Sequence, residues 1–193
     1  MSALAGFRVL VVPGLHGSGP AHWQTRWERL FPWFERVVQH DWDTSDLATW
    51  SARVGEVLRE SAHPTLIVAH SFGCLASVHC AARGASSLAG ALLVAPADPV
   101  KFGIDANLSG ASLACPSILV GSLDDPWMAA ARAAGWAAQW GSEFVNAGKL
   151  GHINADSTLG DWPGGLALLR RLALVARPRT RHRQYNVITT YER

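Results

Sequence analysis

The sequence has few cysteines and no long apolar run. Its three cysteines, Cys74, Cys80 and Cys115, are odd in number and form no C-x-x-C pair, which excludes a disulfide framework and favours free thiols in a reducing compartment. No stretch of about 18 apolar residues lacks a charge or a helix breaker, and residues 1–8 carry no signal-like segment. These absences predict a soluble, cytoplasmic protein with no membrane partner.

Charge is spread unevenly along the chain. The formal net charge of the 193 residues is +2, but residues 177–193 hold five arginines and one glutamate, so removing that +4 leaves −2 on the rest. A short basic end without apolar periodicity is typical of a solvated, disordered segment. We therefore expect one domain over 1–176, long enough to bury a sizeable core, then a disordered tail over 177–193, and no nucleic-acid partner.

Six β-branched runs without apolar–polar alternation predict strands that are covered on both faces. They lie at 7–12, 36–39, 65–69, 90–94, 117–121 and 143–146. Helical patterns alternate with them: a stripe over 23–30, a helix from 47 that Ser45 caps, one that Pro126 can start, and one over 162–175. This alternation predicts an α/β protein, a three-layer α/β/α sandwich with a mainly parallel sheet of about six strands, and places functional groups at the carboxyl ends of the strands.

Ser71 lies at the corner between the third predicted strand and a helix. The stretch A-H-S-F-G over 69–73 differs from the G-x-S-x-G turn called a nucleophile elbow only by Ala69 at its first position. In that turn the serine oxygen stands above the sheet, facing the helix N-terminus. The alternative is that Ser71 only caps the helix.

A serine nucleophile needs a base, and the base needs an orienting carboxylate. His152, in the glycine-flanked loop after the last predicted strand, is the preferred base, and His70 is expected to point away because adjacent side chains diverge at a sharp turn. Five other histidines are less well placed as the base: His16, His22, His40, His79 and His182.

Three carboxylates follow predicted strands and are candidates for the acid. Asp125 is preferred to Asp124 because Pro126 fixes the backbone after it, and Asp98, after the fourth run, is the remaining alternative. The chain order Ser71, Asp125, His152 is that of α/β-hydrolases.

The glycine-rich loop after the first strand, P-G-L-H-G-S-G over 13–19, is the expected source of an oxyanion donor. The backbone N–H groups of Leu15 and Phe72 are the predicted pair, with His16 in place of Leu15 as the fallback. Neither G-x-G-x-x-G nor Gly-Lys-Ser/Thr is present, so we expect no nucleotide site. The chemistry requires no metal and no organic cofactor.

Five motifs together resemble one family of small serine hydrolases. The stretches P-G-L-H-G-S-G-P-A-H-W-Q-T-R-W, D-W-D-T-S-D-L-A-T-W, V-A-H-S-F-G-C, G-S-L-D-D-P-W and G-H-I-N-A-D-S are similar to those of YdeN-like bacterial proteins and retinoblastoma-binding protein nine. The resemblance spans residues 8–172 and implies a minimal α/β-hydrolase fold without a cap domain. It also implies Ser71 as nucleophile, Asp125 as acid and His152 as base.

The resemblance further implies a serine hydrolase, carboxylesterase-like or amidase-like, that cleaves small ester or amide substrates through an acyl-enzyme on Ser71. The alternative is a catalytically silent binding protein on the same fold. We expect a shallow pocket bordered by His16, Trp23 and Trp127. The Leu-x-Cys-x-Glu motif of retinoblastoma binding is absent, because residues 113–117 read L-A-C-P-S, so no such partner is expected.

Overall fold

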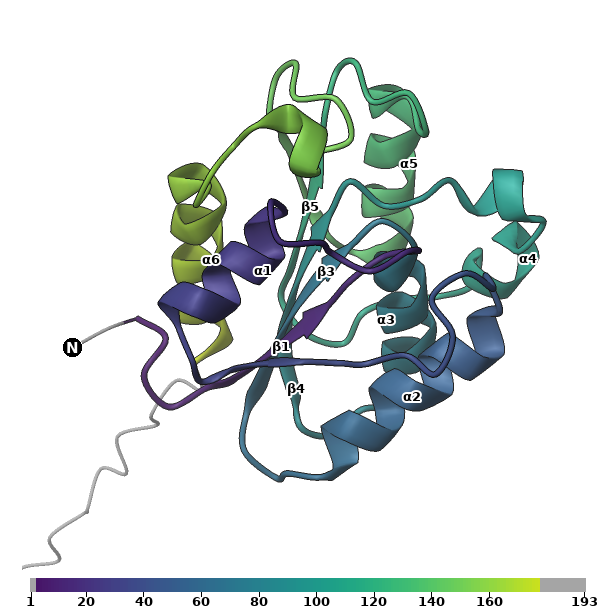
Figure 1. Cartoon of the computed structure of the whole chain (residues 1–193). Coiled ribbons are helices and arrows are strands. Elements are labelled where there is room, and N and C mark those ends of the chain that lie inside the picture. Colours follow the sequence, from purple (N-terminus) through teal and green to yellow (C-terminus); the bar gives the residue numbers. More distant parts are fainter. Residues whose placement is uncertain (1–2, 178–193) are drawn as a thin grey trace, which may run out of the picture.

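A computed structural model describes residues 3–177, and the predicted tail lies almost wholly outside the described residues. One sheet has the strand order β2-β1-β3-β4-β5-β6, and every neighbouring pair is parallel (Figure 1). The strands are β1 (Arg8–Val12), β2 (Phe34–Arg36), β3 (Thr65–His70), β4 (Leu88–Val94), β5 (Ser117–Gly121) and β6 (Glu143–Asn146). The predicted class, an α/β sheet of about six parallel strands, is confirmed.

Helices cover both faces of this sheet (Figure 1). One face carries α1 (Trp23–Leu30) and α6 (Pro163–Ala176), and the other carries α2 (Leu47–Arg59), α3 (Phe72–Ala82) and α5 (Ala130–Trp140). The short elements are η1 (Pro99–Phe102), α4 (Asp105–Leu108) and η2 (Ala155–Ser157). Within residues 3–177, no helix is both long enough and apolar enough to span a bilayer.

Strand β3 shows why the apolar runs lack alternation. All six of its residues are buried, with Ile67 and Ala69 in the core beneath α2, α3 and α5 and Leu66 and Val68 in the core beneath α1 and α6. Since successive side chains of a strand point to opposite faces, a strand with a helical layer on each side needs apolar residues at every position.

The strand order reverses at the centre of the sheet. After β1 the chain moves outward to β2 and then returns to form β3 on the other side of β1. The connections that leave β1 and β3 therefore lead toward opposite edges of the sheet. In open parallel sheets, ligands bind at such a switch point. The loop after β1 and the corner after β3 meet closely here, since a Cβ on Gly14 would lie 2.7 Å from the Cβ of Ser71.

Three predicted boundaries are wrong. The second strand is Phe34–Arg36 rather than 36–39, because Phe34 packs into the core while Val38 is 52% exposed. Helix α2 is capped by Asp46, whose carboxylate accepts from the Thr49 N–H at 2.6 Å, and not by Ser45.

The third error is the helix expected to start at Pro126, which begins only at Ala130. The intervening backbone turns instead, with the Trp127 N–H donating to Asp125 Oδ1 at 2.9 Å. This turn leaves Asp125 outside any helix, at the carboxyl end of β5.

Candidate active site

Ser71 occupies a strained corner between β3 and α3. Its φ of 52° and ψ of −124° are unusual for a residue with a side chain, and the side chain makes no capping hydrogen bond to α3. The tight turn requires Gly73, because a Cβ there would lie 2.3 Å from the Pro13 carbonyl oxygen. Ala69 fits at the first position, fully buried at the end of β3. The corner therefore has the geometry of a nucleophile elbow.

His152 lies between Ser71 and Asp125. Its Nε2 is 3.0 Å from Ser71 Oγ, and its Nδ1 is 2.9 Å from Asp125 Oδ2 and 3.0 Å from Oδ1. The side chains of His152 and Asp125 are only 10% and 3% exposed. A carboxylate can only accept, so Nδ1–H donates to Asp125 and Nε2 is left to accept the Ser71 proton. The structure thus brings together the three residues that the sequence singles out.

The two alternative acids have other partners. Asp124 Oδ1 accepts from Ser122 Oγ and from the Gly151 N–H, each at 2.8 Å, and these hydrogen bonds lower the pKa of Asp124. Asp98 caps η1 through the Val100 N–H at 3.2 Å and pairs with Arg132 at 3.0 Å. Neither carboxylate is hydrogen-bonded to His152 in the structure, so Asp125 alone takes that position among the residues described.

The main chain at His152 and Ile153 is held by hydrogen bonds from two distant elements. His70 Nε2 donates to the His152 carbonyl at 2.9 Å, and Trp23 Nε1 donates to the Ile153 carbonyl at 2.8 Å. Ile153 is held at a φ of 47°, which a β-branched residue rarely adopts. His70, which was not expected to act on Ser71, bonds instead to the main chain of His152, and its ring lies 4.9 Å from the His152 ring.

His22 and His70 form a buried imidazole pair beside the base, with ring centroids 4.7 Å apart. Burial lowers the pKa of His22 to about 4 and holds the pKa of His70 well below its usual value. His22 Nδ1 accepts from the Gln24 N–H at 3.2 Å, while its Nε2 is buried without a hydrogen-bond partner among the residues described. Both rings are therefore neutral near pH 7, and His152 has no cationic histidine beside it.

The backbone N–H groups of Leu15 and Phe72 lie close to the serine corner. The N–H groups of Leu15 and Phe72 donate no hydrogen bond in the part of the chain that the structure describes, whereas the His16 N–H is occupied by the Trp42 carbonyl at 2.8 Å. Leu15 follows Gly14, which abuts Ser71, and a Cβ on Gly14 would lie 3.3 Å from the Phe72 nitrogen. The arrangement thus favours Leu15 over His16 as the partner of Phe72.

A cavity of about 350 Å³ opens over Ser71 and His152. His16 and Trp127 line it as predicted, and Trp127 is 56% exposed. Trp23 does not line it: its indole is 1% exposed in the core, held by its bond to Ile153, which corrects the prediction. The sequence missed several lining residues, namely His22, His70, Ala97, Asp98, Lys101, Phe102 and Asn154. The available signal is their position at a strand end, in the first loop, or in the segments that follow β4 and β6.

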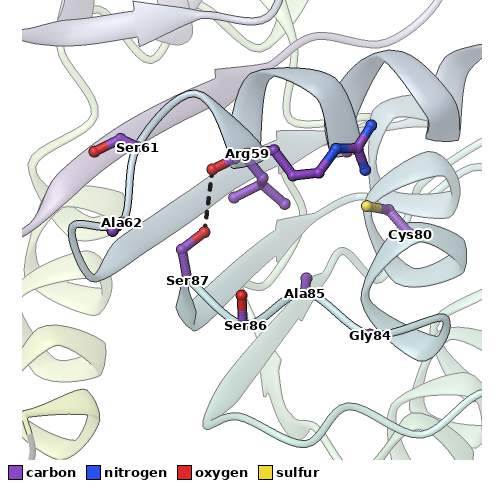
Figure 2. A pocket seen from close by; sticks show the side chains of 10 residues that line it. Arg59, Ser61, Ala62, Cys80, Gly84, Ala85, Ser86 and Ser87 are labelled. Carbon is purple, nitrogen blue, oxygen red and sulfur yellow. Dashed lines mark hydrogen bonds between the residues drawn. The ribbon is translucent and has the colours of Figure 1, made fainter.

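A second hollow lies at the opposite, amino-terminal edge of the sheet, where α2 and α3 end (Figure 2). Arg59 and Cys80 line it, and Ser87 Oγ donates to the Leu58 carbonyl at 3.2 Å beside it. Burial raises the pKa of the Cys80 thiol, so this thiol is a poor nucleophile. Residues 3–177 also contain no group of three His, Cys, Asp or Glu side chains placed to hold a metal ion.

Comparison with known proteins agrees with this geometry. The serine hydrolase family profile matches residues 9–171, and the chain belongs to that family. Among solved structures, a protein described as a YdeN-like hydrolase of Pectobacterium atrosepticum is 38% identical, with a TM-score of 0.87 over 91% of this chain and 95% of that one. The chain is therefore a YdeN-like member of the serine hydrolases.

More distant structures share the fold. The ydeN gene product of Bacillus subtilis is 19% identical, with a TM-score of 0.72 over 86% of this chain and 98% of that chain. A Bacillus cereus carboxylesterase is 14% identical, with a TM-score of 0.58 over 90% of each chain. No curated protein matches the chain in sequence. The fold prediction, an α/β-hydrolase, is confirmed.

Proposed function

We propose that this protein hydrolyses small esters or amides through an acyl-enzyme formed on Ser71. The observation that carries the proposal is the continuous chain of contacts from Asp125 through His152 to Ser71, with a free N–H on each of Leu15 and Phe72. Family membership supports hydrolysis, while the roles of these residues and the substrate class are our inference from their arrangement.

The first half of the reaction forms the acyl-enzyme. His152 Nε2 takes the Ser71 proton as the hydroxyl oxygen attacks the substrate carbonyl carbon, and Asp125 stabilises the imidazolium that results. The carbonyl π electrons move onto oxygen, and the Leu15 and Phe72 N–H groups bind this oxyanion at the positive end of α3. When the oxyanion collapses, the bond to the alcohol or amine breaks, and the leaving group takes the proton from His152.

The second half releases the acid. A water molecule gives a proton to His152 Nε2 and attacks the acyl carbon, again forming an oxyanion at the same two amides. Collapse breaks the bond to Ser71 Oγ, which regains its proton from His152. The groups named here perform every step.

A panel of short acyl esters and aminoacyl amides, compared between the wild type and Ser71→Ala, tests this function. We expect turnover of at least one substrate class by the wild type, and loss of about three or more orders of magnitude in kcat for the variant. Equal rates for folded wild type and variant would overturn the proposal.

The alternative remains a binding protein that uses the same fold without catalysis. The strained elbow favours hydrolysis over this alternative, because backbone strain persists where function needs it.

Transfer of the acyl group to an acceptor other than water would appear as product partitioning when alcohols or amines are added. A cytoplasmic location and the lack of a nucleic-acid or retinoblastoma-protein partner stay predictions from the sequence.

A further inference from the structure

Most ionisable groups that line the cavity over Ser71 are either kept neutral by burial or paired with a neighbouring side chain. Its ionisable residues are His16, His22, His70, Asp98, Lys101 and His152. His22 and His70 are kept neutral by burial. Asp98 is paired with Arg132 at 3.0 Å, and His16 Nδ1 faces Asp43 Oδ1 at 3.0 Å.

Lys101 is the exception. It lies on η1, and no carboxylate among residues 3–177 lies within ion-pair distance of its ammonium group. The Asp125 carboxylate is enclosed against His152 with 3% exposure and does not line the cavity. Lys101 is therefore the one lysine or arginine that lines this cavity in the described chain, and it has no ion-pair partner there.

The position of this ammonium group is defined by two contacts. Lys101 Nζ donates to the Pro126 carbonyl at 3.3 Å and lies 5.7 Å from the centre of the Trp127 ring. The same indole lies 6.3 Å from the ring of His152. Lys101 is thus held one aromatic ring away from the proposed base, with donors left over, because an ammonium group has three.

We propose that the substrates of this site carry an anionic group, a carboxylate in the simplest case, that Lys101 binds at the rim while the acyl carbonyl lies at Ser71. The proposal rests on the proposed function. An ammonium-bearing substrate, such as an aminoacyl ester, is disfavoured by the same charge. Lys101 is then a specificity-determining residue that takes no part in proton transfer.

Matched esters of a fluorogenic alcohol test the proposal. Three acyl chains of equal length end in a methyl, a carboxylate or an ammonium group, and a second series carries the same three groups on the alcohol side. The measured quantity is the ratio of kcat/KM between charged and neutral ester within each variant, which cancels differences in the amount of active enzyme. Wild type should favour the carboxylate over the neutral ester by about fivefold at low salt in at least one series, and less at high salt.

Lys101→Gln should bring this ratio close to one, and Lys101→Glu should invert it in favour of the ammonium ester. Lys149→Gln is the matched control, because Lys149 is also exposed and precedes His152 in the same loop but does not line the cavity. It should keep the wild-type ratio.

The outcomes separate this proposal from the hydrolase proposal. If neutral esters are cleaved but wild type shows no carboxylate preference, or Lys101→Gln keeps the preference, the substrate inference is overturned and hydrolysis stands. A wild-type preference for the ammonium ester overturns it as well. If no ester or amide is cleaved and a neutral fluorophosphonate leaves Ser71 unmodified, the hydrolase proposal fails, and the substrate inference fails with it.

Discussion

His70 donates a hydrogen bond from Nε2 to the backbone carbonyl of His152 at 2.9 Å. The residue that precedes the proposed nucleophile thereby holds the main chain of the proposed base, and it does so as a buried, neutral ring. The hydrogen bond from Trp23 to the Ile153 carbonyl acts in the same way. The two contacts together hold a loop in which Ile153 has a strained backbone conformation. Alignment of His152 with Ser71 depends on elements far apart in the sequence.

Replacing His70 by leucine should lower kcat by about 10- to 100-fold, because loss of the donor to the His152 carbonyl loosens the proposed base. His70→Gln can still donate from its amide and should restore most of the rate. Steady-state kinetics of both variants checks this, with melting temperatures as a control for folding. Equal losses in the two variants would assign His70 to packing alone.

Asp125→Asn should lower kcat by about three to four orders of magnitude, because an amide cannot hold the imidazole in the tautomer that accepts the Ser71 proton. Asp124→Asn is the matched control, since Asp124 binds Ser122 and Gly151 instead. It should act mainly on stability, by about 1–2 kcal/mol. A larger loss of kcat in Asp124→Asn than in Asp125→Asn would reverse the assignment.

The sequence predicted the sheet well because its strands are buried on both faces and so appear as uninterrupted apolar runs. It failed at edges and caps. The sequence predicts the second strand too late because Val37 and Val38 are adjacent β-branched residues, although only Val37 is buried. Pro126 favours a helix start in the sequence, whereas in the structure the Asp125 carboxylate accepts from the Trp127 N–H and holds the next residues in a turn.

The site was predicted in part for a similar reason. Chain order and strand ends pointed to Ser71, Asp125 and His152, and the structure brings these side chains together. Contacts between residues far apart in the sequence leave no local pattern. The sequence therefore does not predict the bond from His70 to the His152 carbonyl, and it wrongly predicts Trp23 in the pocket rather than in the core.

Gly73→Ala should destabilise the protein by about 3 kcal/mol or prevent folding, because the new Cβ would overlap the Pro13 carbonyl oxygen at 2.3 Å. Gly135→Ala is the control on α5, where a Cβ meets nothing within 4 Å and alanine should stabilise the helix by about 0.5–1 kcal/mol. Denaturant unfolding measures both. A neutral Gly73→Ala would show that the elbow is less tight than described.

Stability should fall as the pH is lowered from 7 toward 4, in part because of His22. Burial lowers the pKa of His22 from its usual 6.5 to about 4, so between these values the unfolded chain binds a proton that the folded protein excludes. At pH 5 this costs about 2 kcal/mol of the free energy of unfolding, and the stability is fully present above pH 6.5.

His22→Asn tests this dependence while keeping a side chain that can accept from the Gln24 N–H. Chemical denaturation at pH 7 and pH 5 should show a smaller loss of stability in the variant than in the wild type, by about 2 kcal/mol. His70 is present in both proteins and does not enter the difference directly. Parallel pH profiles would show that His22 titrates normally in the folded state.

The central claim is that Ser71 is an activated nucleophile, and reaction with a neutral fluorophosphonate tests it most directly. Intact mass and peptide mapping after labelling should show one adduct, on Ser71, in the wild type. Folded Ser71→Ala should show none, and His152→Gln should react at least about a hundredfold more slowly. A folded wild type that stays unlabelled, or a Ser71→Ala variant that is labelled as fast as the wild type, would contradict the account.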